Sequence, residues 1–327
     1  MRRRKFLGLI GGALSVPFIA RGQEPGHTYR IGFLIPARRQ TPPVAAFFDE
    51  LRANGFVEGQ NLLVISGGFE ATDDTLTERA KTLVEANLDA IVAGPEAPLR
   101  VLHNLTDKVP LIGVVEDMVS AGLVTSLAHP GGNITGISLL SPELDGKRQD
   151  ILLEAVPAAR RIAVMVDANT TPPSHIQELQ HVGKSRGVEI LVFGASTPDQ
   201  ISSAINSAKA AGAEALNFLA TPLFSIPGTH NNRVVMERVN ALRLPSIFQW
   251  PETAEEAGAP FAYGPRFVDI YRQRAQIVAK IFRGEKPSEI PVQQPTRFEF
   301  VINLKAAKAI GCQVPAGLAL RADKLIE

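Results

Sequence analysis

The chain has few of the residue types that build disulfide frameworks, metal clusters and nucleic-acid surfaces. Its 327 residues include a single cysteine, Cys312, which excludes an internal disulfide and a cysteine-rich metal site. Aromatic side chains make up 6% of the residues. The 34 Lys and Arg nearly balance the 33 Asp and Glu, so the strongly basic footprint of a nucleic-acid-binding domain is absent. The composition is typical of an ordinary α/β protein, and the length predicts two domains.

Motifs for catalysis and metal binding are missing as well. The six His show no His-x-x-x-His or Cys/His spacing, so we expect no metal site. The sequence contains no Gly-x-Ser-x-Gly, no phosphate-binding loop, and no Gly-x-Gly-x-x-Gly after its first predicted strand. Cys312 has no base beside it in the sequence and is interpreted as a packed thiol. These absences favour binding without catalysis, with no cofactor and no catalytic residue.

Residues 1–22 have the pattern of an export signal. A basic start (residues 2–5) precedes an apolar run (residues 7–20), and Ala20 and Gly22 are small residues suited to a cleavage site. Residues 3–7 resemble the twin-arginine signal. We therefore predict a signal peptide that is removed and a protein of the bacterial periplasm; a short membrane anchor is the alternative. Residues 1–22 hold five of the 34 basic side chains and none of the 33 acidic ones, so the mature chain has a net charge of −4.

Beyond the signal, short apolar runs alternate with segments of helical period. The predicted strands are 29–35, 62–66, 90–93, 110–115, 134–137, 161–166, 188–193, 215–219 and 245–248. The predicted helices are 44–54, 73–87, 98–105, 173–186, 198–211 and 231–242. Continuous Val/Ile/Leu strands separated by helices predict parallel sheets covered on both faces. Two such units predict an α/β protein of two doubly wound lobes.

The candidate ligand-binding residues follow these strands. In open parallel sheets, ligands bind beyond the carboxyl ends of the strands, where loops and helix N-termini expose N–H groups. Two lobes with facing strand ends form a cleft, which is a usual place for a small ligand. The polar and aromatic residues at these positions are Arg38, Arg39, Glu96, Glu116, Asp117, Asn169, Thr170, Thr221, Trp250 and Tyr263.

Several of these candidates have a structural alternative that the sequence leaves open. Arg38 and Arg39 form either an anion clamp or a solvated loop pair. Glu96 either contacts a ligand or stabilises the N-terminus of the next helix by its charge. Asp117 either contacts a ligand or accepts hydrogen bonds from backbone amides in a turn. Trp250 is either a stacking wall for the ligand or a packing residue.

A series of short motifs, in order along the chain, resembles one group of ABC-transporter substrate-binding proteins, which includes the binding proteins for tryptophan and other aromatic amino acids. The matching segments are 55–61, 122–127, 129–136, 263–264, 281–287 and 299–307. The resemblance implies a type I periplasmic-binding fold in which the chain crosses three times between lobes. It implies a first lobe of residues 27–137 plus 264–284 and a second lobe of residues 138–263 plus 285–327. The crossings would form a hinge that closes on a ligand and excludes water.

The resemblance also implies the partners. A monomer of this kind would capture a small organic solute, amino-acid-like or aromatic, and deliver it to a membrane permease driven by an ATPase. Relatives that bind aromatic amino acids carry Thr-Gln, Thr-Pro-Ser and Thr-Asp-Asn at three ligand-contacting positions. Here these positions are Leu-Ile-Pro (34–36), Glu-Ala-Pro (96–98) and Ala-Thr-Pro (220–222). We therefore expect a ligand whose polar pattern differs from that of a zwitterionic amino acid, with its acid group received by Arg38 or Arg39.

Two other functions remain alternatives. A periplasmic sensor module would use the same cleft and differ only in its partner. An enzyme would use paired carboxylates such as Glu96 and Glu116 in the cleft. A transcription regulator of related fold is excluded by the export signal and by the lack of a DNA-binding head.

Overall fold

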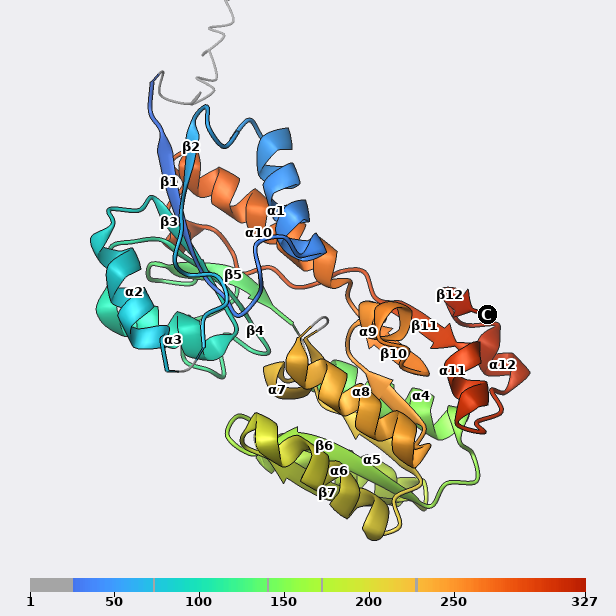
Figure 1. Cartoon of the computed structure of the whole chain (residues 1–327). Helices are drawn as coiled ribbons and strands as arrows, with labels where there is room; N and C mark the ends of the chain where they lie inside the picture. The colour runs from blue at the N-terminus through green and yellow to red at the C-terminus, as the bar shows by residue number, and fades with distance from the viewer. Residues whose placement is uncertain (1–25, 73, 140, 172, 227–228) are drawn as a thin grey trace, which may run out of the picture.

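The computed structural model describes residues 26–72, 74–139, 141–171, 173–226 and 229–327. The predicted export signal, residues 1–22, lies outside this part of the chain. Two lobes, each built around one β-sheet, are connected by chain crossings at a hinge (Figure 1). The prediction of two α/β lobes with parallel sheets is confirmed.

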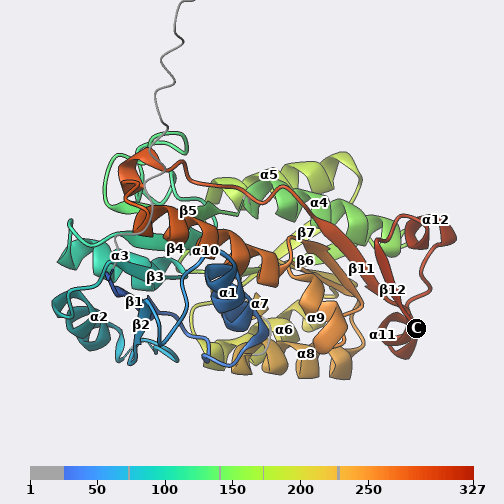
Figure 2. The same ribbon diagram turned by 90° about the horizontal axis from the view of Figure 1, so that it is seen from above.

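The first lobe is a five-stranded parallel sheet with helices on both faces. Its strand order is β2-β1-β3-β4-β5. The strands are β1 (Tyr29–Leu34), β2 (Leu62–Ile65), β3 (Ala90–Ala93), β4 (Leu111–Val115) and β5 (Ile134–Ser138). Helices α1 (Pro42–Ala53) and α10 (Phe267–Phe282) lie side by side over one face (Figure 2). Helices α2 (Leu76–Glu85) and α3 (Glu96–Leu105) cover the other. Every residue of β3 is buried, as expected for a strand covered on both sides.

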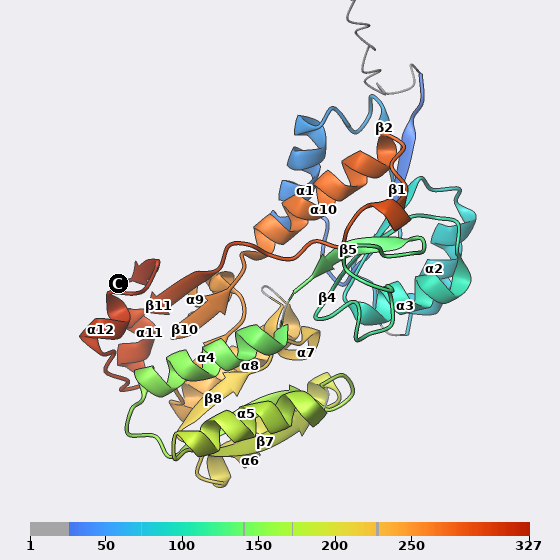
Figure 3. The ribbon, with the colours of Figure 1, turned by 180° about the vertical axis from the view of Figure 1, so that it is seen from behind.

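The second lobe is a seven-stranded sheet of order β12-β11-β10-β9-β8-β6-β7. Its strands are β6 (Arg161–Asp167), β7 (Glu189–Ala195), β8 (Ala215–Phe218), β9 (Ser246–Phe248), β10 (Phe261–Gly264), β11 (Glu299–Asn303) and β12 (Lys324–Ile326). One face packs against α6 (Ile201–Ala210), α8 (His230–Leu242) and α9 (Pro251–Glu256). The other face packs against α4 (Ser141–Ala155), α5 (Pro173–Ser185) and α12 (Ala316–Ala319), with α4 and α5 on the near side in Figure 3. The remaining short elements are η1 (Pro198–Gln200), α7 (Pro222–Ser225), η2 (Pro287–Glu289) and α11 (Leu304–Ala309).

One strand pair of this sheet is antiparallel, which the sequence did not indicate. β10 carries the chain out of the second lobe toward α10, and β11 brings it back, with Gly264 of β10 opposite Glu299 of β11. Because one strand leaves the lobe where the other enters it, the two must run in opposite directions. All other strand pairs of the two sheets are parallel.

The segment that follows α10 stays beside the first lobe before it crosses. The Thr135 hydroxyl donates to the Ile290 carbonyl at 2.8 Å. The Gln293 N–H donates to the Gly136 carbonyl, and the Gln293 carbonyl accepts the Ser138 N–H. Residues 290–293, which fall in the second lobe by the sequence-based boundary at residue 285, therefore hydrogen bond to β5 of the first lobe.

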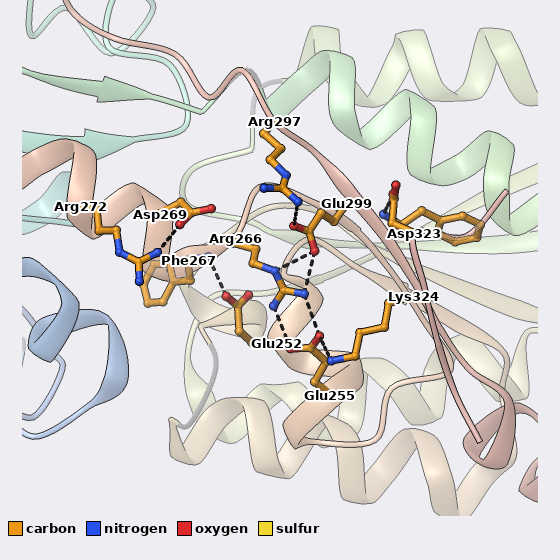
Figure 4. Close-up of polar contacts among 11 residues, drawn as sticks. Glu252, Glu255, Arg266, Phe267, Asp269, Arg272, Arg297, Glu299, Asp323 and Lys324 are labelled. Carbon is orange, nitrogen blue, oxygen red and sulfur yellow. Dashed lines mark hydrogen bonds and ion pairs between the residues drawn. The ribbon is translucent and has the colours of Figure 1, made fainter.

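A network of ion pairs centred on Arg266 joins two of the crossings (Figure 4). Arg266 lies between β10 and α10, and its Nε donates to Glu299 Oε2 at 2.7 Å. Its Nη1 and Nη2 donate to the two carboxylate oxygens of Glu255 at 2.9 and 2.8 Å, and Lys324 Nζ lies 2.8 Å from the same carboxylate. Glu252 Oε1 accepts the N–H of Phe267, the first residue of α10, at 3.0 Å. These contacts fix the direction in which α10 leaves the hinge.

The hydrogen bonds from Arg266 lower the pKa of Glu255 to about 2, from an ordinary value of 4.5. Because the folded-state pKa is the lower one, the resulting stability is present above about pH 4.5 and is lost as the pH falls toward 2. We expect Glu255→Gln to lower the free energy of unfolding at about pH 7 by about 2 kcal/mol. Urea unfolding measures this, with the exposed neighbour Glu256→Gln as the control. If E255Q is less stable than wild type by the same free energy of unfolding below about pH 3 as at about pH 7, the lowered pKa of Glu255 is contradicted.

Candidate ligand-binding site

A pocket lies between the two lobes, beyond the carboxyl ends of their strands. It is partly open to solvent and is lined by residues of both lobes, as is usual for a small-molecule site. The first lobe contributes loops after β1, β3, β4 and β5 and one face of α10: Pro36, Ala37, Gly94, Pro95, Val114, Glu116, Leu139, Phe267, Tyr271 and Arg274. The second lobe contributes loops after β8 and β9: Thr221, Pro222, Ile226, Gln249 and Trp250.

Aromatic rings form one wall of the pocket. Trp250 packs on Phe267 with ring centroids 4.7 Å apart, and Phe267 packs edge-on against Tyr271 at 5.2 Å. Trp250 belongs to the second lobe while the other two belong to α10, so this wall spans the hinge. It offers an apolar surface of inclined rings to a ring or a short hydrocarbon chain.

The floor of the pocket carries a buried guanidinium. Arg274 lies in the middle of α10 and is fully buried. Its Nη2 donates to the carbonyls of Ala93 and Ile112 at 2.5 and 3.1 Å, and its Cζ lies 5.1 Å from the Tyr271 ring centroid. Burial lowers the pKa of Arg274, an effect that Tyr271 partly offsets, but an arginine stays charged in a protein. Among the described residues, Nε and Nη1 have no hydrogen-bond partner.

Glu116 is the acidic group of the pocket. It follows β4 and is half-buried. Desolvation raises its pKa to about 7 from an ordinary 4.5, and the carboxylates of Glu96, Asp145 and Asp167 add to the rise. Near neutral pH it therefore exchanges between a hydrogen-bond donor and an anion.

A buried cluster in the second lobe positions the loop after β8. Asp145 of α4 pairs with Arg148, and its Oδ2 lies 3.3 Å from His175 Nε2. The Ala220 N–H donates to Asp145 Oδ1 at 3.2 Å. Because Ala220 precedes Thr221, this contact fixes where the loop meets the pocket.

The turn that carries Gln249 is held by close backbone packing. A Cβ built on Gly264 would lie 2.0 Å from the Gln249 carbonyl oxygen. Only glycine lets β10 pass this close to the loop after β9. The side-chain amide nitrogen of Gln249 and the indole nitrogen of Trp250 are buried and have no partner among the described residues.

Three of the ten candidate residues from the sequence line the pocket: Glu116, Thr221 and Trp250. The two arginines after β1 instead pair with acids on the surface. Arg38 Nε lies 2.9 Å from Glu70 Oε1, and Arg39 pairs with Glu58. Arg38 is 75% exposed, and a ligand contact by either arginine stays a prediction.

The other candidates have structural partners of their own. Glu96 begins α3 and pairs with Arg100, although its charge still reaches Glu116. Asp117 accepts hydrogen bonds from the backbone N–H groups of residues 119 and 120, as in a turn, and from the Ser120 hydroxyl.

Three more candidates belong to the second lobe and do not line the pocket: Asn169 and Thr170 follow β6, and Tyr263 lies within β10. Asn169 donates to the Ser196 carbonyl at 2.9 Å, and the Thr170 N–H donates to the Asp167 carbonyl. The Tyr263 carbonyl accepts from Arg148 at 3.0 Å. A ligand contact by any of these residues stays a prediction.

Arg274 was not among the candidates from the sequence, although the sequence carries a signal for it. The buried face of α10 repeats at Ile270, Arg274, Val278 and Ile281, which is helical spacing. A charged residue on such a face is rarely buried without a function or a partner. Attention to strand ends alone passes over a residue in the middle of a helix.

No group of His, Cys, Asp or Glu in the described part of the chain could hold a metal ion. Cys312 is half-buried, and burial raises the pKa of its thiol. It lies outside the pocket.

The fold and the site define a class of protein. Two α/β lobes, joined by a hinge and enclosing a pocket at facing strand ends, form a type I periplasmic-binding fold. A model of the family described as ABC transporter substrate binding protein matches residues 39–326, and the chain belongs to this family.

The chain is similar to the following proteins of known structure or name at 18–24% identity. The tyrosine-binding protein of Clostridioides difficile is 24% identical over 270 residues, covering 82% of this chain and 76% of its own. A conserved domain protein from Vibrio cholerae superposes with a TM-score of 0.78 at 23% identity, over 91% of this chain and 99% of its own. A Streptococcus ABC domain in complex with L-Trp superposes with a TM-score of 0.76 at 18% identity, over 91% of this chain and 100% of its own.

We expect Glu116→Gln to change how stability depends on pH. A folded-state pKa of about 7, above the ordinary 4.5, means that the folded state binds the proton more tightly, so stability falls as the pH rises through this range. The variant lacks this loss and should be more stable than wild type by up to about 2 kcal/mol at about pH 8, and equal at about pH 4. Urea unfolding across this range measures it.

The matched control is Glu178→Gln, on an exposed position of α5. If the free energies of unfolding of E116Q and E178Q depend on pH in the same way, burial does not raise the pKa of Glu116.

Proposed function

We propose that the protein captures a small organic solute in the interlobe pocket and delivers it to the permease of an ABC transporter, whose ATPase supplies the energy. The chain itself would act as a monomer without catalysis. Substrate-binding proteins of this family are typically extracellular or periplasmic, and we place this one in the periplasm. No helix of the described residues is long and apolar enough to cross a membrane.

The observation that carries the proposal is that one pocket takes its walls from both lobes. Trp250 and Gln249 come from the second lobe, and Phe267, Tyr271 and Arg274 from α10 of the first. A ligand that touches both groups favours the closed arrangement of the lobes, because it gains contacts there that the open one lacks. A permease that recognises the closed form would then respond only to loaded protein.

The departure from known relatives also bears on the ligand. The tyrosine-binding relative and the L-Trp complex share the fold with this chain at 24% and 18% identity. Relatives that bind aromatic amino acids carry the hydroxyl-bearing Thr-Pro-Ser where this chain has Glu-Ala-Pro (96–98). Here Glu96 pairs with Arg100. We propose that the solute is amino-acid-like or aromatic in size but is held by a different polar set.

The proposal predicts closure and stabilisation by a pocket ligand. A solute at about 100 times its Kd should stabilise the folded state by about 2.7 kcal/mol and raise Tm by roughly 5 °C. The radius of gyration from small-angle X-ray scattering should fall at the same concentration. Amino acids, aromatic acids, sugars and nucleobases form the test panel.

Ala37→Trp provides the blocked variant, because Ala37 lines the pocket and an indole there would fill it. Ala45→Trp, on an exposed position of α1, is the control. Binding that survives A37W unchanged, or a panel in which no solute alters Tm or shape, would argue against capture in this pocket.

A further inference from the structure

Arg274 is a buried charge for which the described residues provide no counter-ion. Its guanidinium donates to the backbone carbonyls of Ala93 and Ile112 and to the Tyr271 hydroxyl, and none of these acceptors carries a full negative charge. A guanidinium has five N–H groups, and the three on Nε and Nη1 have no acceptor among the described residues. A buried ion in this condition is strongly destabilising unless an anion reaches it.

The acidic group of the pocket, unlike Arg274, can lose its charge. Glu116 relieves the cost of its own burial by taking up a proton, because its pKa is raised to about 7. Arg274 has no such route, since an arginine does not deprotonate in a protein. Of the two groups, therefore, only the guanidinium requires an opposite charge from outside the chain.

The uncharged polar groups of the lining also favour a ligand that accepts hydrogen bonds. The Gln249 amide nitrogen and the Trp250 indole nitrogen are buried donors with no acceptor among the described residues. Together with Arg274 they give the pocket a surplus of N–H donors. A ligand rich in acceptor oxygens satisfies them, whereas an amine brings further donors.

The rest of the lining limits the body of the ligand. Trp250, Phe267 and Tyr271 present aromatic surface to the pocket. Apolar groups are stabilised against these walls by removal from water.

We infer that the ligand is an organic carboxylate with an apolar body and no cationic group, and that Arg274 binds its carboxylate. This inference rests on the proposed capture function and names its substrate class. In the bound state, a carboxylate oxygen accepts from Arg274 while the apolar body lies against the aromatic wall.

Matched probes test the substrate class with the wild-type protein. Benzoate, 3-phenylpropanoate and hexanoate are each titrated by calorimetry beside the corresponding amide and amine, and L-phenylalanine is added as the amino-acid match of 3-phenylpropanoate. At least one carboxylate should bind, its amide about 10- to 100-fold more weakly, and its amine not at all. L-Phenylalanine should bind about 10-fold or more weakly than 3-phenylpropanoate.

Amides or amines that bind as tightly as the acids, a preference for L-phenylalanine, or a complete failure of the carboxylates would each overturn the inference. If solutes without a carboxylate bind and A37W blocks them, capture in the pocket stands while the substrate class falls. If no solute of any class binds, both fall.

Variants at position 274 test the role of the guanidinium. Arg274→Gln should weaken carboxylate binding about 10- to 100-fold, and Arg274→Lys, which keeps the charge, should retain part of the affinity. The control is Arg272→Gln, because Arg272 lies on the same helix, is 50% exposed and pairs with Asp269.

Trp250→Phe removes a single pocket donor and keeps the aromatic wall, so it tests the donor surplus without altering Arg274. It should weaken the carboxylates relative to their amides by several-fold, with Tm in the absence of ligand as the check on folding. Carboxylate binding that is unchanged in R274Q, or unchanged in W250F if R274Q does not fold, would overturn the assignment.

Discussion

A guanidinium that is fully buried without a carboxylate partner is the constraint on which the site depends. Arg274 is held by two strand carbonyls of the first lobe, so its position is set by the sheet rather than by a mobile loop. The second lobe contributes the N–H donors of Gln249 and Trp250 to the lining of the same pocket. The guanidinium stays protonated, and the neighbouring N–H donors have no acceptor among the described residues. An anionic solute would supply both the opposite charge and the acceptor atoms.

The hinge determines how two separate sheets come to share this pocket. Strand ends of both lobes face it, and α10 starts at the crossing where Arg266 joins Glu255 to Glu299. Because Arg274 lies two turns further along the same helix, the ion pairs at the crossing also set the orientation of the ligand-facing side chains. The ionic network thus serves the site without touching it, and the recognition of a solute is coupled to the arrangement of the lobes.

Most of the strands could be predicted from the sequence because they are continuous apolar runs. β3, for example, is Ala90–Ala93 in both descriptions. Helix α4 was missed because its buried side chains include Asp145, Arg148 and Gln149, so the apolar period that marks a helix is absent. Of the candidate site residues, those in the pocket were found from strand ends. Arg38 and Arg274 show what could not be predicted from strand ends. Arg38 pairs with Glu70 and Arg274 is buried against Ala93, and both contacts join residues that are distant in sequence.

The central claim is that the pocket carries an organic acid on Arg274. It is tested most directly by native mass spectrometry of protein purified from its own cells under non-denaturing conditions, followed by release and identification of the bound solute. The account predicts one molecule per chain of a small carboxylate without an amino group, absent from the R274Q variant purified in parallel. An amino acid, a sugar or an amine in the pocket would contradict it.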